Sequence, residues 1–219
     1  MINRIKLSLL LFSVLLISCS GQTSHTRGVY LLLDTSGTYT EEINKGQAII
    51  NYLLGTLTPG DSLAVARIDS GSFSEKDIIA KVTFDNRPST ANAQKRTFQE
   101  KVNNFVATVK SSSYTDISGG VLQGVEFLNE TGAANKYILI FSDLKEDLEK
   151  GHIRDFPIAF RGVHVVALNV TKLKSDNIDP RKYLERVEKW QTRVESGGGT
   201  WRMVNDLDRI DSLLDEPKS

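Results

Sequence analysis

The chain has 219 residues, and its 27 basic and 27 acidic side chains give a formal net charge of zero at pH 7. Basic residues do not gather on any one stretch, which argues against a nucleic-acid partner. Cys19 is the single cysteine of the sequence, so an intrachain disulfide is excluded and stability must come from a hydrophobic core.

The N-terminus has the pattern of an export signal. Basic residues precede an apolar stretch over residues 7–17, whose 11 residues (17 − 7 + 1) fall short of the about 20 that a membrane-spanning helix needs. The ending Leu16-Ile17-Ser18-Cys19 resembles a bacterial lipobox, in which the chain is cleaved before the cysteine and the cysteine is acylated. The resemblance predicts a signal peptide over residues 1–18 and a polar tether over residues 19–27.

The same resemblance predicts where the protein resides. A lipid on Cys19 would anchor the chain to a membrane of the bacterial cell envelope. Ser20 stands where an inner-membrane retention signal has Asp, which favours the outer membrane, facing the periplasm. The alternative is an ordinary secretory peptide with an incidental cysteine.

Residues 28–219 alternate between strand patterns and helix patterns, which predicts one α/β domain. The unbroken apolar run at residues 29–33 is typical of a parallel strand buried on both faces. Further strands are expected at residues 63–68, 78–84, 137–141, 163–170 and 201–204. Helices are expected at residues 41–57, 91–110, 117–131, 183–194 and 206–214.

Residues 78–84 differ from the other strands because apolar and polar residues alternate in them. Such alternation fits a half-exposed edge strand that pairs antiparallel with the strand before it. We therefore predict a three-layer, doubly wound and mostly parallel sheet with one antiparallel edge strand, a Rossmann-like architecture. The carboxyl ends of its parallel strands would meet at one edge, where open α/β folds bind ligands.

Oxygen-bearing side chains follow two of these strands and precede one helix. Asp34, Ser36 and Thr38 follow the first strand at alternate positions, Thr115 precedes a helix, and Asp143 follows the strand at residues 137–141. Carboxylates and hydroxyls are the ligands that a hard cation such as Mg²⁺ prefers. Alone, the first of these motifs has a simpler interpretation, in which Ser36 and Thr38 only cap the helix that follows.

Together, these three elements resemble a known family. Asp34-Thr35-Ser36-Gly37-Thr38 is similar to the Asp-x-Ser-x-Ser loop of von Willebrand factor type A (vWA) domains, Thr115-Asp116 to their Thr-Asp loop, and Phe141-Ser142-Asp143 to their third element. The resemblance covers residues 28–214. It departs from the family at Thr38, where Ser is usual, and at Leu144, where Gly is common and the bulkier side chain could alter the loop.

The resemblance implies a metal-ion-dependent adhesion site formed by Asp34, Ser36, Thr38, Thr115 and Asp143. This site would hold Mg²⁺, or another divalent cation such as Mn²⁺ or Ca²⁺, and would break no bond. Mg²⁺ rarely receives all its ligands from one protein. An acidic side chain of a protein partner would then complete the coordination.

Two tyrosines flank the expected metal ligands. Tyr39 and Tyr114 could contact the partner; equally, they could pack the rim of the site.

Two alternative functions remain open. Asp34-Thr35-Ser36-Gly37-Thr38 also resembles the Asp-x-x-Gly-Thr loop of haloacid-dehalogenase-type phosphoryl-transfer enzymes, with Asp34 as the nucleophile and Asp143 and Asp147 as the acidic Mg²⁺ pair. Against it, Ser36 replaces the second Asp that such phosphatases use as a general acid. The other alternative is a metal-free scaffold that binds partners through its surface loops.

Overall fold

The computed structural model of the chain describes residues 25–37, 39, 42–207, 210 and 213–214. Its strands are β1 (Arg27–Asp34), β2 (Ser62–Ile68), β3 (Ile78–Thr83), β4 (Asn135–Phe141), β5 (Val163–Leu168) and β6 (Thr200–Val204). Its helices are α2 (Ile43–Thr56), α3 (Pro88–Thr108), α4 (Ile117–Thr131) and α5 (Arg181–Ser196), with short 3₁₀ helices η2 (Glu75–Asp77) and η3 (Lys174–Asn177).

The six strands form one sheet in the order β3-β2-β1-β4-β5-β6. Every neighbouring pair is parallel except β2 and β3, which pair antiparallel with a bulge between Val65 and Ala66. The predicted fold class is therefore confirmed, including the antiparallel edge strand. The fold is vWA-like, and β1 and β4 lie at its centre.

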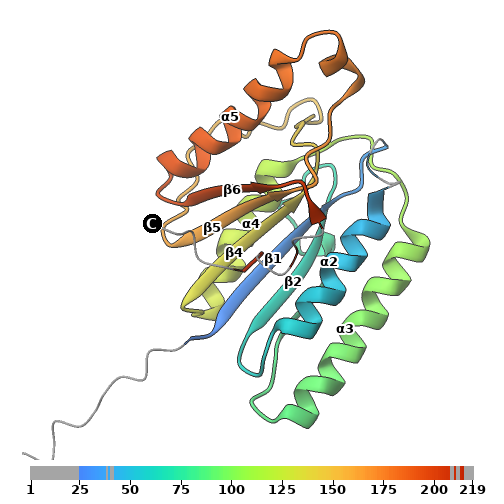
Figure 1. Ribbon diagram of the computed structural model, residues 1–219, viewed down its shortest axis with the longest axis vertical. Coiled ribbons are helices and arrows are strands. Elements are labelled where there is room, and N and C mark those ends of the chain that lie inside the picture. Colours follow the sequence, from blue (N-terminus) through green and yellow to red (C-terminus); the bar gives the residue numbers. More distant parts are fainter. Residues whose placement is uncertain (1–24, 38, 40–41, 208–209, 211–212, 215–219) are drawn as a thin grey trace, which may run out of the picture.

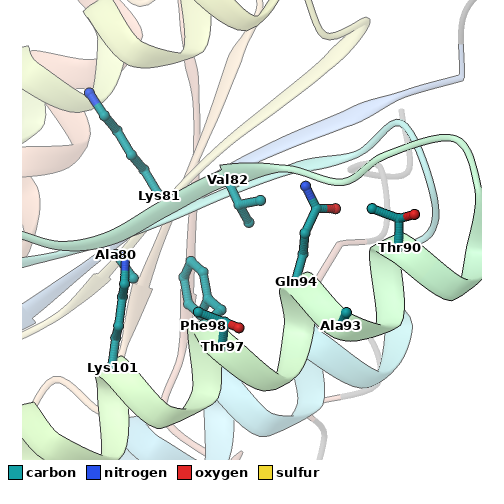
Figure 2. Close-up of a pocket in the computed structure, with 9 residues that line it drawn as sticks. All are labelled: Ala80, Lys81, Val82, Thr90, Ala93, Gln94, Thr97, Phe98 and Lys101. Carbon is teal, nitrogen blue, oxygen red and sulfur yellow. The ribbon is translucent and has the colours of Figure 1, made fainter.

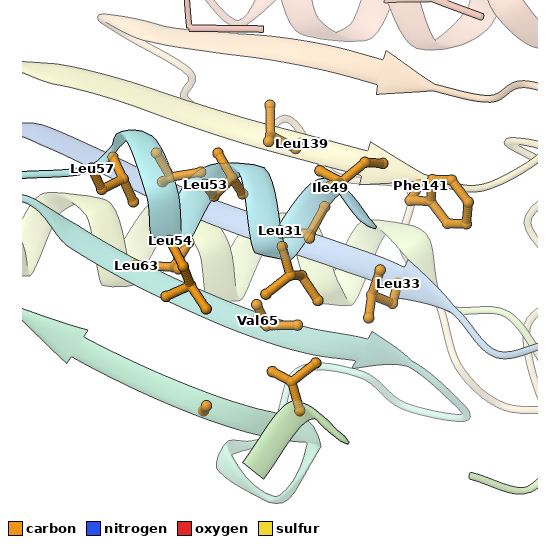
Figure 3. Packing of buried hydrophobic residues seen from close by; sticks show 14 of the residues in the cluster. Leu31, Leu33, Ile49, Leu53, Leu54, Leu57, Leu63, Val65, Leu139 and Phe141 are labelled. Carbon is orange, nitrogen blue, oxygen red and sulfur yellow. The ribbon is translucent and has the colours of Figure 1, made fainter. Parts of the chain in front are cut away.

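The apolar run in β1 is buried on both faces because helices cover both sides of the sheet (Figure 1). Val29, Leu31 and Leu33 pack into one cluster with α2 and α3, whereas Tyr30 and Leu32 pack into a second cluster with α4 and α5. Figure 3 shows the first cluster, in which leucines of α2 meet the side chains of the central strands. Alternate residues of a strand point to opposite faces, so one continuous apolar run supplies two cores.

Helix α4 lies unusually close to β1. A Cβ atom added at Gly120 would lie 2.7 Å from Leu32 Cδ2, and one added at Gly124 would lie 2.7 Å from Tyr30 Cδ1. Real Cβ atoms do not approach carbon so closely, so a larger residue at either position would force the buried side chain of Leu32 or Tyr30 to shift. The close approach fixes the N-terminal end of α4, and with it Thr115, against the sheet.

Several predicted boundaries differ from the structure by a few residues, and those of α3 and β5 have a clear physical reason. Helix α3 begins at Pro88, because proline suits the first turn of a helix, whose N–H groups have no intrahelical partner. It also ends earlier than predicted, at Thr108. Strand β5 ends at Leu168 and not at residue 170, because Asn169 has a φ of 51°, which interrupts an extended strand.

Several predictions fall outside the described residues. These are the signal peptide, the lipidated Cys19, most of the tether and part of the closing helix expected at residues 206–214. In the part of the chain that the structure describes, no helix has both the length and the apolar character needed to cross a membrane.

Candidate metal centre

Asp34 ends β1 at the centre of the carboxyl edge and is completely buried. Its Oδ1 accepts a hydrogen bond from the backbone N–H of Ser36 at 2.8 Å, and its Oδ2 accepts one from the Ser142 hydroxyl at 2.6 Å. Burial raises the pKa of the Asp34 carboxyl, and these hydrogen bonds oppose the rise only in part. Asp34 is therefore a buried carboxylate whose described partners are neutral donors.

Asp143 follows β4 and faces the same region. Its side chain is buried, and its Oδ1 accepts a hydrogen bond from the backbone N–H of Lys145 at 2.8 Å. Burial, together with the negative charge of Asp34, raises the pKa of the Asp143 carboxyl to about 6. Two neighbouring carboxylates whose pKa values are both raised by burial would be stabilised by a cation.

Main-chain hydrogen bonds join the loops that carry the predicted ligands. Thr115 and Asp147 form an isolated antiparallel bridge, with N···O distances of 2.7 and 3.0 Å in its two directions. Ser112 donates its backbone N–H to the carbonyl of Thr35 at 2.8 Å, which ties the loop before α4 to the loop after β1. The three segments are thus fixed to one another by the backbone itself.

A cavity of about 260 Å³ opens where these loops meet. Ser36, Thr115 and Asp143 line it, so three of the five predicted ligands share one cavity. The rest of its lining is mostly small or polar: Gly37, Ser112, Ser113, Lys145, Asp147 and Leu173. Asp34 is linked to this lining through its hydrogen bond with the backbone of Ser36. Thr38, the remaining predicted ligand, lies outside the described residues.

The donor set of this cavity fits a hard dication. Within the described residues, no group of three or more His, Cys, Asp or Glu side chains is placed to hold a metal ion. A site with two carboxylates completed by hydroxyls and water needs no such group. Each carboxylate oxygen of Asp34 can accept a further interaction beyond the one it has, because a carboxylate has about four lone-pair directions.

The two flanking tyrosines have different positions. Tyr39 is buried, packs edge-on against Phe141 at a centroid distance of 5.0 Å, and donates its hydroxyl hydrogen to the carbonyl of Asn169. Tyr114 is partly exposed near the cavity. In this structure Tyr39 packs beneath the rim, and Tyr114 is the one of the two that a partner could contact.

Leu144 adopts a left-handed backbone conformation, with a φ of 64°. This conformation is strained for a residue with a Cβ atom, whereas glycine adopts it freely. The Leu144 side chain is buried in the same cluster as Trp190, and its carbonyl accepts a hydrogen bond from the indole Nε1 at 3.3 Å. Packing against α5 therefore holds the loop in the conformation that glycine would adopt freely.

The sequence did not reveal how Asp116 is used. Its carboxylate accepts hydrogen bonds from the backbone N–H groups of Gly119 and Ser72, at 2.8 and 3.0 Å, and forms an ion pair with Arg154 at 2.7 Å. The first of these contacts is an N-terminal cap of α4, which an Asp before a helix does indicate. Arg154 lies in an irregular loop where no pattern singles it out.

Comparisons with known proteins bear on the fold. No protein-family model matches the sequence, and no curated protein matches it. Among solved structures, the pilus adhesin SpaC from Lactobacillus rhamnosus GG, in an open conformation, has a TM-score of 0.52 and 11% identity over 89% of this chain. The PilB minor pilin from Streptococcus sanguinis, as its D319A mutant, has a TM-score of 0.50 and 10% identity, also over 89% of this chain.

This chain covers 30% of the SpaC chain and 60% of the PilB chain, and so less than two thirds of each. A von Willebrand factor type A protein from Catenulispora acidiphila also matches, with a TM-score of 0.46 and 14% identity over 87% of this chain and 41% of that one. At such low identities, the similarity to SpaC and PilB concerns the fold alone.

Proposed function

We propose that this protein is a non-catalytic binding module that holds Mg²⁺, or a similar divalent cation, and captures a protein partner through it. The observation that carries the proposal is the pair of buried carboxylates, Asp34 and Asp143, beside a cavity lined with hydroxyl groups. Ser36, Thr115 and Thr38 would supply the neutral oxygen ligands. The metal, when bound, would offer an open coordination position to an acidic side chain of the partner.

Burial of Asp34 argues for binding over phosphoryl transfer. A nucleophilic carboxylate must present a free oxygen to the phosphorus atom of its substrate. The Asp34 side chain is completely buried and does not line the cavity, which leaves no room beside its oxygens for the phosphorus atom of a substrate.

We further propose that a lipid on Cys19 holds this module at the cell envelope, on the outer membrane facing the periplasm. The proposal rests on the lipobox-like sequence and on the absence of a membrane-crossing helix among the described residues. Changing Cys19 to Ala would move the protein from the membrane fraction to the soluble fraction of the envelope. Retention of the Cys19→Ala protein in the membrane fraction would contradict lipid anchoring.

The metal proposal is tested by calorimetric titration of the purified protein with Mg²⁺ and Mn²⁺. Wild-type protein should bind one ion, and Asp34→Asn should bind none while keeping its circular dichroism spectrum. Asp116→Asn is a control for a general effect of removing a buried charge, because Asp116 is already paired with Arg154. Unchanged metal affinity in Asp34→Asn would rule out the site.

Partner capture needs a second experiment. The protein is immobilised with Mg²⁺, exposed to envelope extract, and then treated with EDTA. Proteins released from wild-type protein but absent with Asp34→Asn are metal-dependent partners. If the bound proteins are the same for both forms and survive EDTA, the protein binds through its loops without metal.

A further inference from the structure

Strand β3 forms one edge of the sheet, and β2 separates it from β1, the strand that carries Asp34. Among the described strands it pairs with β2 alone. A strand with one neighbour directs every second N–H and C=O pair outward, where another strand can bind. The side chain of Gln94 lies near the far end of the strand, with its Nε2 3.5 Å from the carbonyl of Thr83. The open part of the edge is therefore residues 78–82, in which Ile79 is the extra residue where the β2–β3 register shifts.

A groove runs between β3 and α3 on one face of this edge (Figure 2). It has a volume of about 290 Å³. Ala80, Val82 and Phe98 form its apolar wall, and Gln94 and Lys101 lie at its rim. A neighbouring strand could insert small apolar side chains here.

The opposite face of the same edge is also hollowed. Two cavities of about 220 and 250 Å³ adjoin there, and both are lined by Lys81, Phe127 and Glu130. Glu75 and Glu126 also line the first of them, so three carboxylates face one ammonium group. We call this hollow the acidic trench; it would accept basic side chains from a neighbouring strand.

The side chains of strand β3 match the groove and the acidic trench, because apolar residues lie on one face of the strand and a lysine on the other. Ala80 and Val82 point toward α3, whereas Lys81 points to the other face (Figure 2). We propose that β3 of a second copy of this chain pairs antiparallel with β3, about a two-fold axis perpendicular to the sheet. Such an axis reverses the strand direction and keeps each face of the sheet on its own side. Ala80 and Val82 of the copy then enter the groove, and Lys81 of the copy enters the acidic trench.

Lysine on an edge strand often prevents this kind of pairing, so the position of Lys81 matters. Its ammonium group forms an ion pair with Glu75 at 2.9 Å on the α4 side. The side chain therefore extends over one face of the sheet and leaves the row of backbone groups open. A trench with two further carboxylates, Glu126 and Glu130, gives the lysine of the second copy its own partners.

The experiment measures the dimerisation constant of the full chain in detergent by sedimentation velocity and light scattering. Lys81→Glu should weaken dimerisation by about tenfold, since two symmetry-related sets of ion pairs are lost and each exposed pair contributes modestly. Lys81→Glu combined with Glu126→Lys and Glu130→Lys should restore it. Lys182→Glu, on exposed helix α5 at the other end of the sheet, is the matched control and should have no effect.

Cross-linking tests the contact directly. Of single cysteines placed in turn at residues 78–82, only those nearest the two-fold axis should give disulfide-linked dimers on oxidation, because a disulfide needs Cα atoms within about 7 Å of each other. A cysteine at Met203 on β6 and the parent chain should give none. A chain that remains monomeric up to about 1 mM would overturn the proposal. A dimer whose dissociation constant is unchanged by Lys81→Glu would also overturn it. Cross-linking of β3 to a different protein would overturn it too, because the edge would then bind a strand of that protein.

Discussion

Two kinds of buried carboxylate lie at the carboxyl edge of the sheet. Asp116 is paired with the guanidinium of Arg154 at 2.7 Å and accepts two backbone hydrogen bonds besides. Asp34 and Asp143 have only neutral hydrogen-bond donors in the contacts described above, and the Asp34 charge helps to raise the pKa of Asp143. The chain pairs Asp116 with its own cation, whereas Asp34 and Asp143 have no direct ion pair among the described contacts and, under the proposed function, would be neutralised by a cation from solution.

The largest loss of folding stability should come from breaking the ion pair between Asp116 and Arg154. Asp116→Ala leaves the Arg154 guanidinium without its carboxylate in a largely buried place, and should lower the free energy of unfolding by about 3–5 kcal/mol. The loss should be the same with and without Mg²⁺, as measured by urea denaturation. A loss that Mg²⁺ repairs would place Asp116 among the metal ligands and erase the distinction between the two kinds of site.

In metal-free protein, Asp143→Asn should raise the free energy of unfolding, whereas Asp116→Ala should lower it. The folded pKa of Asp143, about 6, lies above its usual 3.8, so its contribution to stability is present below about pH 4 and is lost as the pH rises through 6. Near pH 7.5, metal-free Asp143→Asn should therefore be more stable than wild type, by at most about 3 kcal/mol. The advantage should vanish near pH 4; an advantage that persists there would assign it to packing.

Saturating Mg²⁺ should offset most of the stability advantage of Asp143→Asn over wild type. A ligand at a hundred times its dissociation constant stabilises the folded state by about 2.7 kcal/mol. Wild-type protein should show this gain in thermal unfolding, whereas Asp143→Asn and Asp34→Asn should not. Equal gains in all three proteins would show that the ion binds elsewhere.

The smallest loss of folding stability should come from removing one neutral hydrogen-bond donor, the hydroxyl of Ser142. Ser142→Ala removes the hydroxyl that donates to Asp34 Oδ2 at 2.6 Å, and should lower the free energy of unfolding by about 1.5 kcal/mol. This loss is smaller than that of Asp116→Ala because a hydroxyl compensates a buried carboxylate less than a guanidinium does. Urea denaturation of both variants at one pH gives the comparison, and a Ser142→Ala loss as large as that of Asp116→Ala would contradict it.

The sequence predicted the parts of this architecture that depend on local pattern. The apolar run of β1 indicated burial on both faces, and the alternation in β3 indicated an antiparallel edge strand. Because parallel strands end at one edge, their order also predicted that Ser36, Thr115 and Asp143 would meet, and these three line one cavity. Their role as metal ligands remains a prediction.

What the sequence could not predict depends on contacts between distant segments. Arg154 is 38 residues from Asp116 and lies in a loop without periodicity, so nothing local links the two. The burial of Tyr39 depends on Phe141 and Asn169, which come from two other strands or their ends. The left-handed conformation of Leu144 depends on packing against α5, and propensity alone would have disfavoured it.

The main-chain hydrogen bonds that join the three loops at the carboxyl edge have a consequence for dynamics. The amides of Ser112, Thr115 and Asp147 are all held in these bonds. Their hydrogen–deuterium exchange should therefore be slow before any ion arrives and should change little afterwards. A rim that is already ordered loses little conformational entropy on binding, so under the proposed function an ion would be taken up and released without breaking these main-chain bonds.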